Sequence, residues 1–277
     1  MTTADAGGAT RGDSGSPEVQ QQQGQLPRKE KSALNVVFRF RVLLHVVIYG
    51  LGLWAPWDYA LHLDANGIST WLMVAAWPAR SGWLGFTAST VTVLTLGILF
   101  TLLGALLRTW GTAYLSTGVV FDGSLQAQRL LADGPYRRMR NPLYAGTVLH
   151  TLGLVLLMPP SGAVFSLGGI VALQMALVAA EEQFLLTTRG SEYAAYKQMV
   201  PGWVPSLSAN VTASGARPQW LQAFLGESYM WGVFVSFAVL GWRYNSLLVL
   251  RGVIVSLGVS LVARAFVRGE PTRRGAC

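Results

Sequence analysis

Six long apolar runs, separated by polar segments rich in arginine, dominate the hydrophobic pattern of this chain. A helix needs about 20 mostly apolar residues to cross the hydrocarbon core of a bilayer, so each run is predicted to span a membrane. The first run is long enough only if it includes Arg39 and Arg41, whose long side chains can reach the headgroups. The predicted fold class is therefore all-α, a polytopic transmembrane helical protein of about six spans. These spans are residues 36–57, 83–107, 142–158, 161–180, 228–242 and 246–266.

Proline and tryptophan mark two of the connections between these runs. Pro159 and Pro160 predict a tight turn between the third and fourth spans, so these two spans form a helical hairpin. Trp71 and Trp77 lie between the first two spans, and tryptophan favours the membrane–water interface. Residues 58–82 are therefore interpreted as an external loop with an interfacial segment.

Composition and charge support a membrane protein and give its orientation. Of the residues, 52% are hydrophobic and 12% are charged, whereas soluble domains carry about 25% charged residues. The net charge is +8, and the basic residues lie between the apolar runs, which favours membrane topology over nucleic-acid binding. Both termini and the polar segments 108–141 and 181–227 are expected on the cytoplasmic side of a bacterial cytoplasmic membrane. Residues 1–33 are rich in Gly, Ser and Gln, which predicts a disordered tail.

Cysteine and histidine give no sign of a metal site. The single cysteine, Cys277, cannot form a disulfide within the chain, and His45, His62 and His150 are scattered. Each histidine is interpreted as a packing or interfacial residue, and no metal is expected.

The first segment with candidate chemistry covers residues 131–144. Gly134 and Pro135 predict a turn, and Pro142 predicts a helix start, because proline is tolerated at the first position of a helix. The free backbone N–H groups of that helix start lie beside three arginines, which favours anionic or polar ligand groups. The alternative is that the arginines only anchor the topology and that Tyr136 and Tyr144 belong to an aromatic belt.

The second segment begins with Glu181 and Glu182, directly after an apolar span. Adjacent carboxylates at a membrane boundary are costly to desolvate and repel each other, so a bound cation or ribose hydroxyls would stabilise them. The alternative is that the helix continues to Gly190 and leaves both glutamates in water. The hairpin between the two segments returns the chain to the same face of the membrane, so the segments can meet there.

Together, these motifs resemble the isoprenylcysteine carboxyl methyltransferase and phospholipid methyltransferase superfamily over residues 95–206. The order and spacing of the motifs carry the resemblance. They are Gly134-Pro135-Tyr136, Arg140-Asn141-Pro142-Leu143-Tyr144, Glu181-Glu182, Gly190-Ser191-Glu192-Tyr193, Tyr196 and Val200-Pro201.

The resemblance implies an S-adenosylmethionine pocket between the two segments and methyl transfer to a lipid-like or small hydrophobic acceptor through oxygen, nitrogen or sulfur. Arg140 is assigned to catalysis, as the group that orients the acceptor or stabilises charge. The residues assigned to the cofactor are Gln128, Arg129, Leu130, Leu131, Tyr136, Asn141, Pro142, Leu143, Tyr144, Glu181 and Glu182.

Three positions depart from the superfamily pattern. Asn141 replaces a common histidine, Arg189 stands where phenylalanine is usual, and Leu177 replaces a substrate-binding arginine of the carboxyl methyltransferases. The last departure weakens the case for a prenylcysteine carboxylate as the acceptor. Two other functions stay open, namely a membrane reductase of related fold that uses a nicotinamide cofactor and a non-catalytic membrane scaffold.

Three regions follow from this interpretation. Residues 1–33 form the tail, residues 34–206 form the methyltransferase core, and residues 207–277 form an accessory transmembrane hairpin. The oligomeric state and the acceptor are not given by the sequence.

Overall fold

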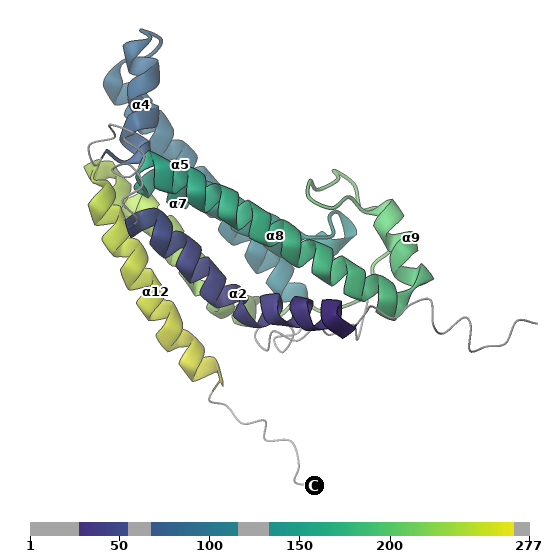
Figure 1. The fold of residues 1–277 in the computed structure, drawn as a ribbon. Helices are drawn as coiled ribbons and strands as arrows, with labels where there is room; N and C mark the ends of the chain where they lie inside the picture. Colours follow the sequence, from purple (N-terminus) through teal and green to yellow (C-terminus); the bar gives the residue numbers. More distant parts are fainter. Residues whose placement is uncertain (1–27, 55–67, 116–132, 269–277) are drawn as a thin grey trace, which may run out of the picture.

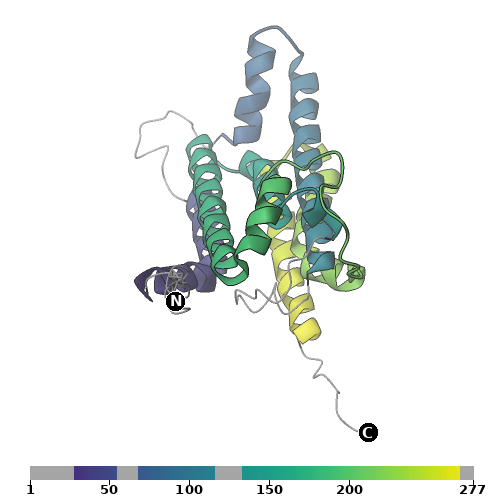
Figure 2. The ribbon, with the colours of Figure 1, turned by 90° about the vertical axis from the view of Figure 1, so that its right-hand side faces the viewer.

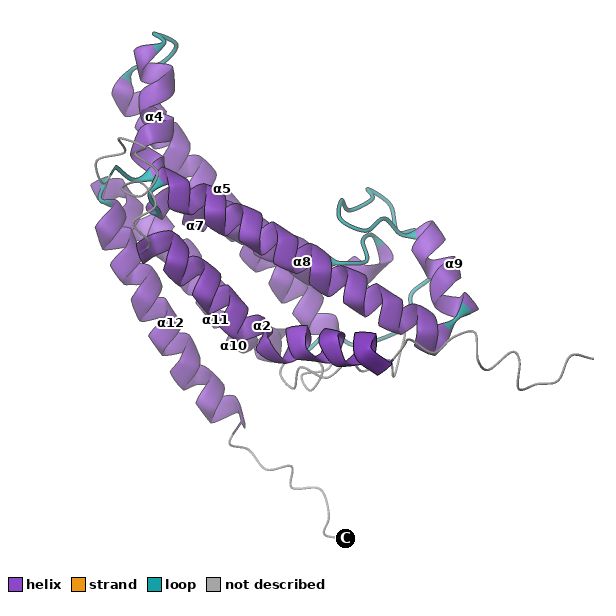
Figure 3. Cartoon of the chain, viewed as in Figure 1, coloured by secondary structure: helices purple, strands orange, loops and turns teal. Residues whose placement is uncertain are grey.

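The structure of the protein is a computed structural model that describes residues 28–54, 68–115 and 133–268. Every regular element in these residues is a helix, and Figure 3 shows no strand among them, which confirms the all-α prediction. The long helices are α2 (Arg28–Trp54), α5 (Phe86–Tyr114), α8 (Pro160–Arg189) and α12 (Ser246–Arg268). The shorter α-helices are α4 (Thr70–Arg80), α7 (Pro142–Leu154), α9 (Ser191–Met199), α10 (Trp220–Gly226) and α11 (Ser228–Val235).

The long helices run side by side, and the polar elements gather at one end of them. α5 packs along α7, α2 packs along α8, and α12 packs along α11 (Figure 1). α4 and the first part of α5 extend beyond the other helices at the opposite end (Figure 2). The start of α2 and the ends of α8 and α12 therefore lie at the end away from α4, together with α9.

Glycines at seven-residue spacing bring α5 and α7 into close contact. Gly97, Gly104 and Gly111 lie on α5, and Gly146 and Gly153 lie on α7. A Cβ atom on Gly104 would lie 2.8 Å from the carbonyl oxygen of Gly146, so no larger residue fits there without moving the backbone. Small residues of this kind allow close helix packing in membranes, where lipid tails leave little hydrophobic drive for association.

The number of membrane spans is smaller by strict criteria than the predicted six. Among the described residues, α5, α8 and the Ser246–Ala263 part of α12 are long and apolar enough to cross a membrane. A fourth candidate is a broken span, α10 with Ser228–Arg243, which is bent by 65°. The apolar helices Phe40–Trp54 and Pro142–Leu157 are shorter, so a count of six is not established.

One predicted boundary differs from the structure, and one helix was not predicted. The fourth span was expected to end at Ala180, but α8 continues to Arg189, where Gly190 caps it with a positive φ of 54°. The helix of the fifth predicted span starts at Ser228, as expected, but the sequence did not predict the additional helix α10 before it. The chain continues after α11 through a π-helical turn (Ser236–Leu240) and a 3₁₀ turn (Gly241–Arg243).

The segment between the first two spans contains a helix. Residues 55–67 lie outside the described part, but α4 covers most of the rest of the predicted loop. Trp71 is 4% exposed and donates its indole N–H to the carbonyl of Thr90, 3.3 Å away, so it packs inside the protein. Trp77 and Trp83 are exposed and lie edge to face.

Candidate functional site

The start of α7 is the centre of the candidate site. Pro142 is the first residue of α7, as its lack of an N–H group predicted. Asn141 precedes it, and no side chain caps the first turn of the helix. The Asn141 side-chain amide instead donates to the carbonyl of Gly202 at 3.2 Å. An amide thus fills the place of the superfamily's histidine and joins the helix start to a distant segment.

The end of α8 brings the first glutamate of the pair to α7. The Tyr144 hydroxyl donates to Glu181 Oε2 at 2.7 Å. Leu177 lies one turn earlier on α8, is 1% exposed, and belongs to an apolar cluster against which Tyr144 packs. Leu177, which stands at the position of the superfamily's arginine, is therefore a buried residue of the apolar cluster next to the Tyr144–Glu181 pair.

The second glutamate lies between two cations. Glu182 Oε1 is 3.1 Å from Arg140 Nε, and its Oε2 is 2.8 Å from Lys197 Nζ of α9. The side chains of Arg140 and Glu182 are 13% and 12% exposed, so neither glutamate simply projects into water as the alternative interpretation required. Arg140 Nη1 also donates to the carbonyl oxygens of Lys197, at 2.6 Å, and Val200, at 3.2 Å. These contacts fix the guanidinium in one orientation.

Tyr136 contributes a buried hydroxyl with no hydrogen-bond partner among the described residues. It lies in the 3₁₀ turn η1 (Gly134–Arg137), whose position is held by a hydrogen bond of 2.8 Å from the Tyr196 hydroxyl to the Tyr136 carbonyl. Burial, followed by the charge of Glu181, raises the pKa of Tyr136 well above its usual value, so the phenol keeps its proton. An unpaired buried donor beside a carboxylate favours a polar ligand at this position.

Residues 200–219, called the strap here, hold this site together. The strap leaves α9, runs along the segment 133–141 in the opposite direction, and ends at α5. Its backbone hydrogen bonds are Arg140 N to Pro201 O, Asn141 N to Gly202 O, Ser206 N to Arg138 O, Asn210 N to Arg137 O and Gln219 N to Ala113 O. The polar character of this region was predicted, but its course was not.

Asp133 fastens the far end of the strap. Its carboxylate accepts backbone N–H groups from Ser214 at 3.0 Å, Gly215 at 3.2 Å and Ala216 at 2.9 Å. Burial alone would raise the pKa of Asp133, but these hydrogen bonds outweigh it and hold the pKa below its ordinary value. The aspartate is therefore ionised while the strap is in place.

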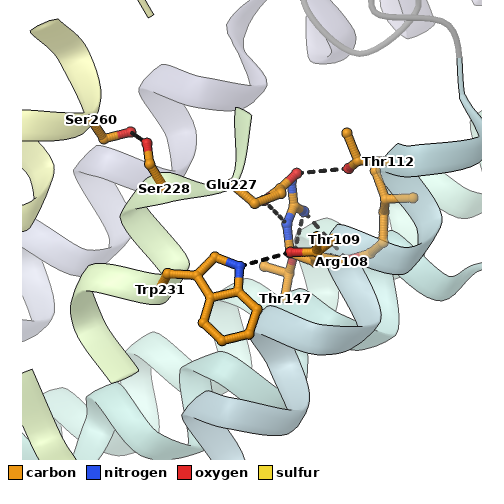
Figure 4. Close-up of polar contacts among 9 residues, drawn as sticks. Arg108, Thr109, Thr112, Thr147, Glu227, Ser228, Trp231 and Ser260 are labelled. Atoms are coloured by element: carbon orange, nitrogen blue, oxygen red, sulfur yellow. Dashed lines mark hydrogen bonds and ion pairs between the residues drawn. The ribbon is translucent and has the colours of Figure 1, made fainter. Parts of the chain in front are cut away.

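A buried ion pair links the site to the C-terminal helices. Figure 4 shows Arg108 of α5 reaching Glu227, which lies at the bend between α10 and α11. Arg108 Nε is 2.7 Å and Nη2 is 2.9 Å from the carboxylate, which also accepts from the Thr112 hydroxyl at 2.9 Å. Arg108 Nη1 donates to Thr147 Oγ1 on α7 at 2.8 Å. Neither residue of the ion pair was identified from sequence. The available signal was Glu227, a lone acidic residue directly before an apolar run.

An apolar groove of about 760 Å³ lies beside this ion pair. Its walls are one face of α5, the adjoining face of α7, Trp203–Pro205 of the strap, and residues of α10 and α11. Thr109 is one of the lining residues, and its hydroxyl accepts the Trp231 indole N–H at 2.9 Å (Figure 4).

The structure brings together most of the residues predicted for the site. Tyr136, Arg140, Asn141, Pro142, Tyr144, Glu181 and Glu182 all lie around the start of α7 and the end of α8. Leu143 points the other way and packs over Gly111 of α5. Gln128, Arg129, Leu130 and Leu131 lie outside the described residues. In the described part of the chain, no three His, Cys, Asp or Glu side chains are placed to share a metal ion.

Residues 92–190 match the phospholipid methyltransferase family, which confirms the resemblance over that segment. The segment includes α5, the start of α7 and the glutamate pair, and it ends before α9. The match covers little more than a third of the chain, and the apolar helices agree with an integral membrane protein.

The chain is also similar to the cobalt-zinc-cadmium resistance protein CzcN of Cupriavidus metallidurans. The two are 28% identical over 141 residues, which are 51% of this chain and 62% of that protein. The match thus leaves more than a third of the relative uncovered. No solved structure matches the chain.

Proposed function

We propose that the chain transfers a methyl group from S-adenosylmethionine to a lipid-like acceptor, at the end of the helix bundle where α7 begins. The observation that supports this best is the set of polar groups around that helix start. They are the Tyr144–Glu181 hydrogen bond, the Arg140–Glu182–Lys197 cluster and the unpaired hydroxyl of Tyr136. All but Lys197 belong to the segment that matches the methyltransferase family.

The residues present fit this cofactor. Glu181 suits the ribose hydroxyls or the methionine ammonium, and the N–H groups at the uncapped start of α7 suit the methionine carboxylate. Tyr136 offers an unpaired donor, and the partly buried ring of Tyr144 offers an apolar surface for the adenine or the sulfonium. The predicted residues Gln128 to Leu131 complete this set in the proposal.

The reaction depends on how the donor and the acceptor are positioned, and it requires no nucleophile from the protein. The cofactor supplies a methyl group that is already activated on a sulfonium. A lone pair on the acceptor heteroatom forms the new bond to carbon, while the carbon–sulfur bonding pair stays on sulfur. The protein orients the two partners in line and excludes water. Arg140 is proposed to orient the acceptor, because its contacts with Glu182 and two backbone carbonyls hold its charge in place.

Calorimetry in detergent tests the cofactor site. Glu181→Gln should weaken S-adenosylmethionine binding by about ten- to a hundredfold, because a charged hydrogen bond contributes roughly 1.5–3 kcal/mol. Glu192→Gln is the matched control, since this glutamate is 58% exposed and pairs with Arg189 away from the site. Equal affinity in the parent and both variants would contradict the assignment. Binding of a nicotinamide cofactor instead would favour the reductase, and binding of neither would favour the scaffold.

The site is also proposed to face the cytoplasm, with both termini on that side. The reason is the positive-inside rule, since the segment 133–141 and the strap together carry four arginines. With Cys277 replaced by serine, Ser208→Cys should stay unlabelled by an impermeant thiol reagent applied to intact cells. Labelling from outside would contradict this orientation.

A further inference from the structure

We infer that the apolar groove beside α5 binds one hydrocarbon chain of an anionic membrane lipid, and that the C-terminal helices select that chain. If the proposed function is correct, this lipid is the methyl acceptor. The groove is separate from the polar groups at the start of α7, and part of its wall lies outside the segment that matches the family.

The lining of the groove fits a hydrocarbon chain. Leu103 and Leu106 of α5 face it from one side, and Trp220 and Phe224 of α10 face it from the other. Its volume of about 760 Å³ lies within the range of roughly 300–1,000 Å³ that is usual for small-molecule sites. These four side chains remain between 45% and 48% exposed, and α5 is long and apolar enough to span a membrane. The groove therefore opens sideways, toward the lipid chains.

The charges next to the groove fit an anionic headgroup. Besides Arg140, whose charge is paired with Glu182, the segment 133–141 and the strap carry three arginines, Arg137, Arg138 and Arg217. Asp133 is the only acidic residue in these two described stretches, and three backbone N–H groups of the strap neutralise its carboxylate locally. Trp203–Pro205 belongs both to the strap and to the groove, and Arg138 donates to the carbonyl of Leu207, two residues further along the strap, so this guanidinium lies near the groove wall. Such an arrangement is complementary to a lipid with a phosphate or another anionic group above one chain.

The groove also ends close to the proposed site of reaction. α7 presents Ala145 and Val148 to the groove, while the neighbouring Tyr144 binds Glu181. The hydrogen bond from Asn141 to Gly202 places the strap residue before Trp203 at the start of the same helix. A chain lying in the groove would thus bring its polar end to the helix start.

The C-terminal helices give the groove its selectivity. Phe224 and Trp231 form one wall, and both lie beyond residue 190, where the match with the methyltransferase family ends. Trp231 is fixed by its hydrogen bond to Thr109, so this wall has a defined position on α5. The length and shape of the bound chain then depend on residues particular to this protein.

Photolabelling tests the binding site directly. The probe is phosphatidylglycerol with a diazirine in one acyl chain, added to the full-length protein in phosphatidylcholine nanodiscs, and the labelled peptides are identified by mass spectrometry. Leu106→Trp places a larger side chain in the groove. Leu99→Trp is the matched control, because Leu99 lies seven residues earlier on α5 and is 46% exposed, like Leu106, but does not line the groove.

The expected result is labelling of groove peptides that saturates with probe concentration. Leu106→Trp should weaken this labelling by about tenfold, the effect of excluding two methylene groups, and Leu99→Trp should leave it unchanged. A phosphatidylcholine probe with the same diazirine chain should label the groove less than the phosphatidylglycerol probe. Labelling that rises linearly with either probe and is equal in both variants would mean ordinary boundary lipid and would overturn the inference.

The same variants separate this inference from the proposed function. In assays of methyl transfer into a total lipid extract, Leu106→Trp should lower the rate while cofactor affinity stays at the parent value. Saturable labelling that is lost in Leu106→Trp would support lipid binding in the groove, whether or not the parent transfers a methyl group. A parent protein that binds lipid in this way but transfers no methyl group would count against the proposed function alone. Equal transfer by both variants, with a changed labelling pattern, would overturn the link between the groove and the acceptor.

Discussion

Removal of the carboxylate of Glu227 should destabilise the protein strongly, because it leaves a buried arginine unpaired. The side chain of Glu227 is 3% exposed and that of Arg108 is 20% exposed, so water can solvate the guanidinium only in part once its carboxylate partner is removed. Loss of one partner from a buried pair typically costs about 3–5 kcal/mol. Since a fifth of Arg108 remains accessible, we expect Glu227→Leu to lower the free energy of unfolding by about 3 kcal/mol, the lower end of this range.

Two further variants show whether the unpaired charge is the cause. In the double variant Arg108→Met with Glu227→Leu, no charge is left buried, so most of the lost stability should return. Ser260→Ala removes an uncharged hydrogen bond of 3.0 Å to Ser228 in the same C-terminal helices (Figure 4). This control should cost only about 0.6 kcal/mol, the average for such bonds in a membrane protein.

The assay is unfolding in mixed micelles by titration with sodium dodecyl sulfate, followed by circular dichroism. The parent, Ser260→Ala and the double variant should have similar free energies of unfolding, and that of Glu227→Leu should be well below all three. The reasoning would be refuted if Glu227→Leu lost no more stability than Ser260→Ala, or if the double variant were the least stable of all.

Two other predictions concern the strap and the helix contact. Asp133→Asn should speed hydrogen exchange of the amides of residues 214–216 by about fivefold or more, because charged hydrogen bonds are about twice as strong as neutral ones, while the Gln219 amide should not change. Because the folded state lowers the pKa of Asp133, its carboxylate stabilises the strap at any pH above the unfolded pKa, and this stabilisation is lost as the pH falls through the folded pKa. Acid should therefore speed exchange in the parent as the substitution does. Equal exchange in parent and variant near neutral pH would contradict this. Gly104→Ala should lower the thermal stability measured by circular dichroism, because its Cβ would lie 2.8 Å from two backbone atoms of α7, whereas Gly168→Ala, which meets nothing within 4 Å, should be neutral; equal melting of the two variants would contradict the close contact.

The helices were predictable where a local rule decides their ends. Pro142 and Pro160 each open a helix, as the fixed φ and missing N–H of proline require. Gly190 closes α8 with a positive φ, a conformation that glycine adopts without a Cβ clash. For Glu181 and Glu182, the helix continues to Gly190 as the alternative interpretation held, but their side chains bind Tyr144 and Arg140 instead of lying in water, and a ligand at this pair stays a prediction.

The strap was not predictable from local pattern. Its partners in the segment 133–141 lie 60 to 83 residues earlier in the chain, so no short-range periodicity encodes the pairing. The same reason explains why Arg108 and Glu227 were missed, since they are 119 residues apart. The predicted boundary at residue 206 between a core and an accessory hairpin remains untested, but this ion pair crosses it.

The glycine contact was visible in the sequence but was not recognised as a repeat. Gly97, Gly104 and Gly111 recur every seven residues, which places them on one face of a helix. Only the structure shows that α7 lies against this face and that Gly146 and Gly153 meet it. The spacing alone does not say whether such a face meets another helix or lipid.

Methyl transfer itself tests the central claim most directly. The purified full-length protein in nanodiscs is incubated with S-adenosylmethionine labelled in its methyl group and with a total lipid extract, and the labelled lipid is identified by chromatography and mass spectrometry. The parent and Glu192→Gln should place the label in a lipid, and Glu181→Gln should slow this by about ten- to a hundredfold at limiting cofactor. A folded parent protein that binds the cofactor but labels no lipid would contradict a lipid acceptor, and a Glu181→Gln variant as active as the parent would contradict the site.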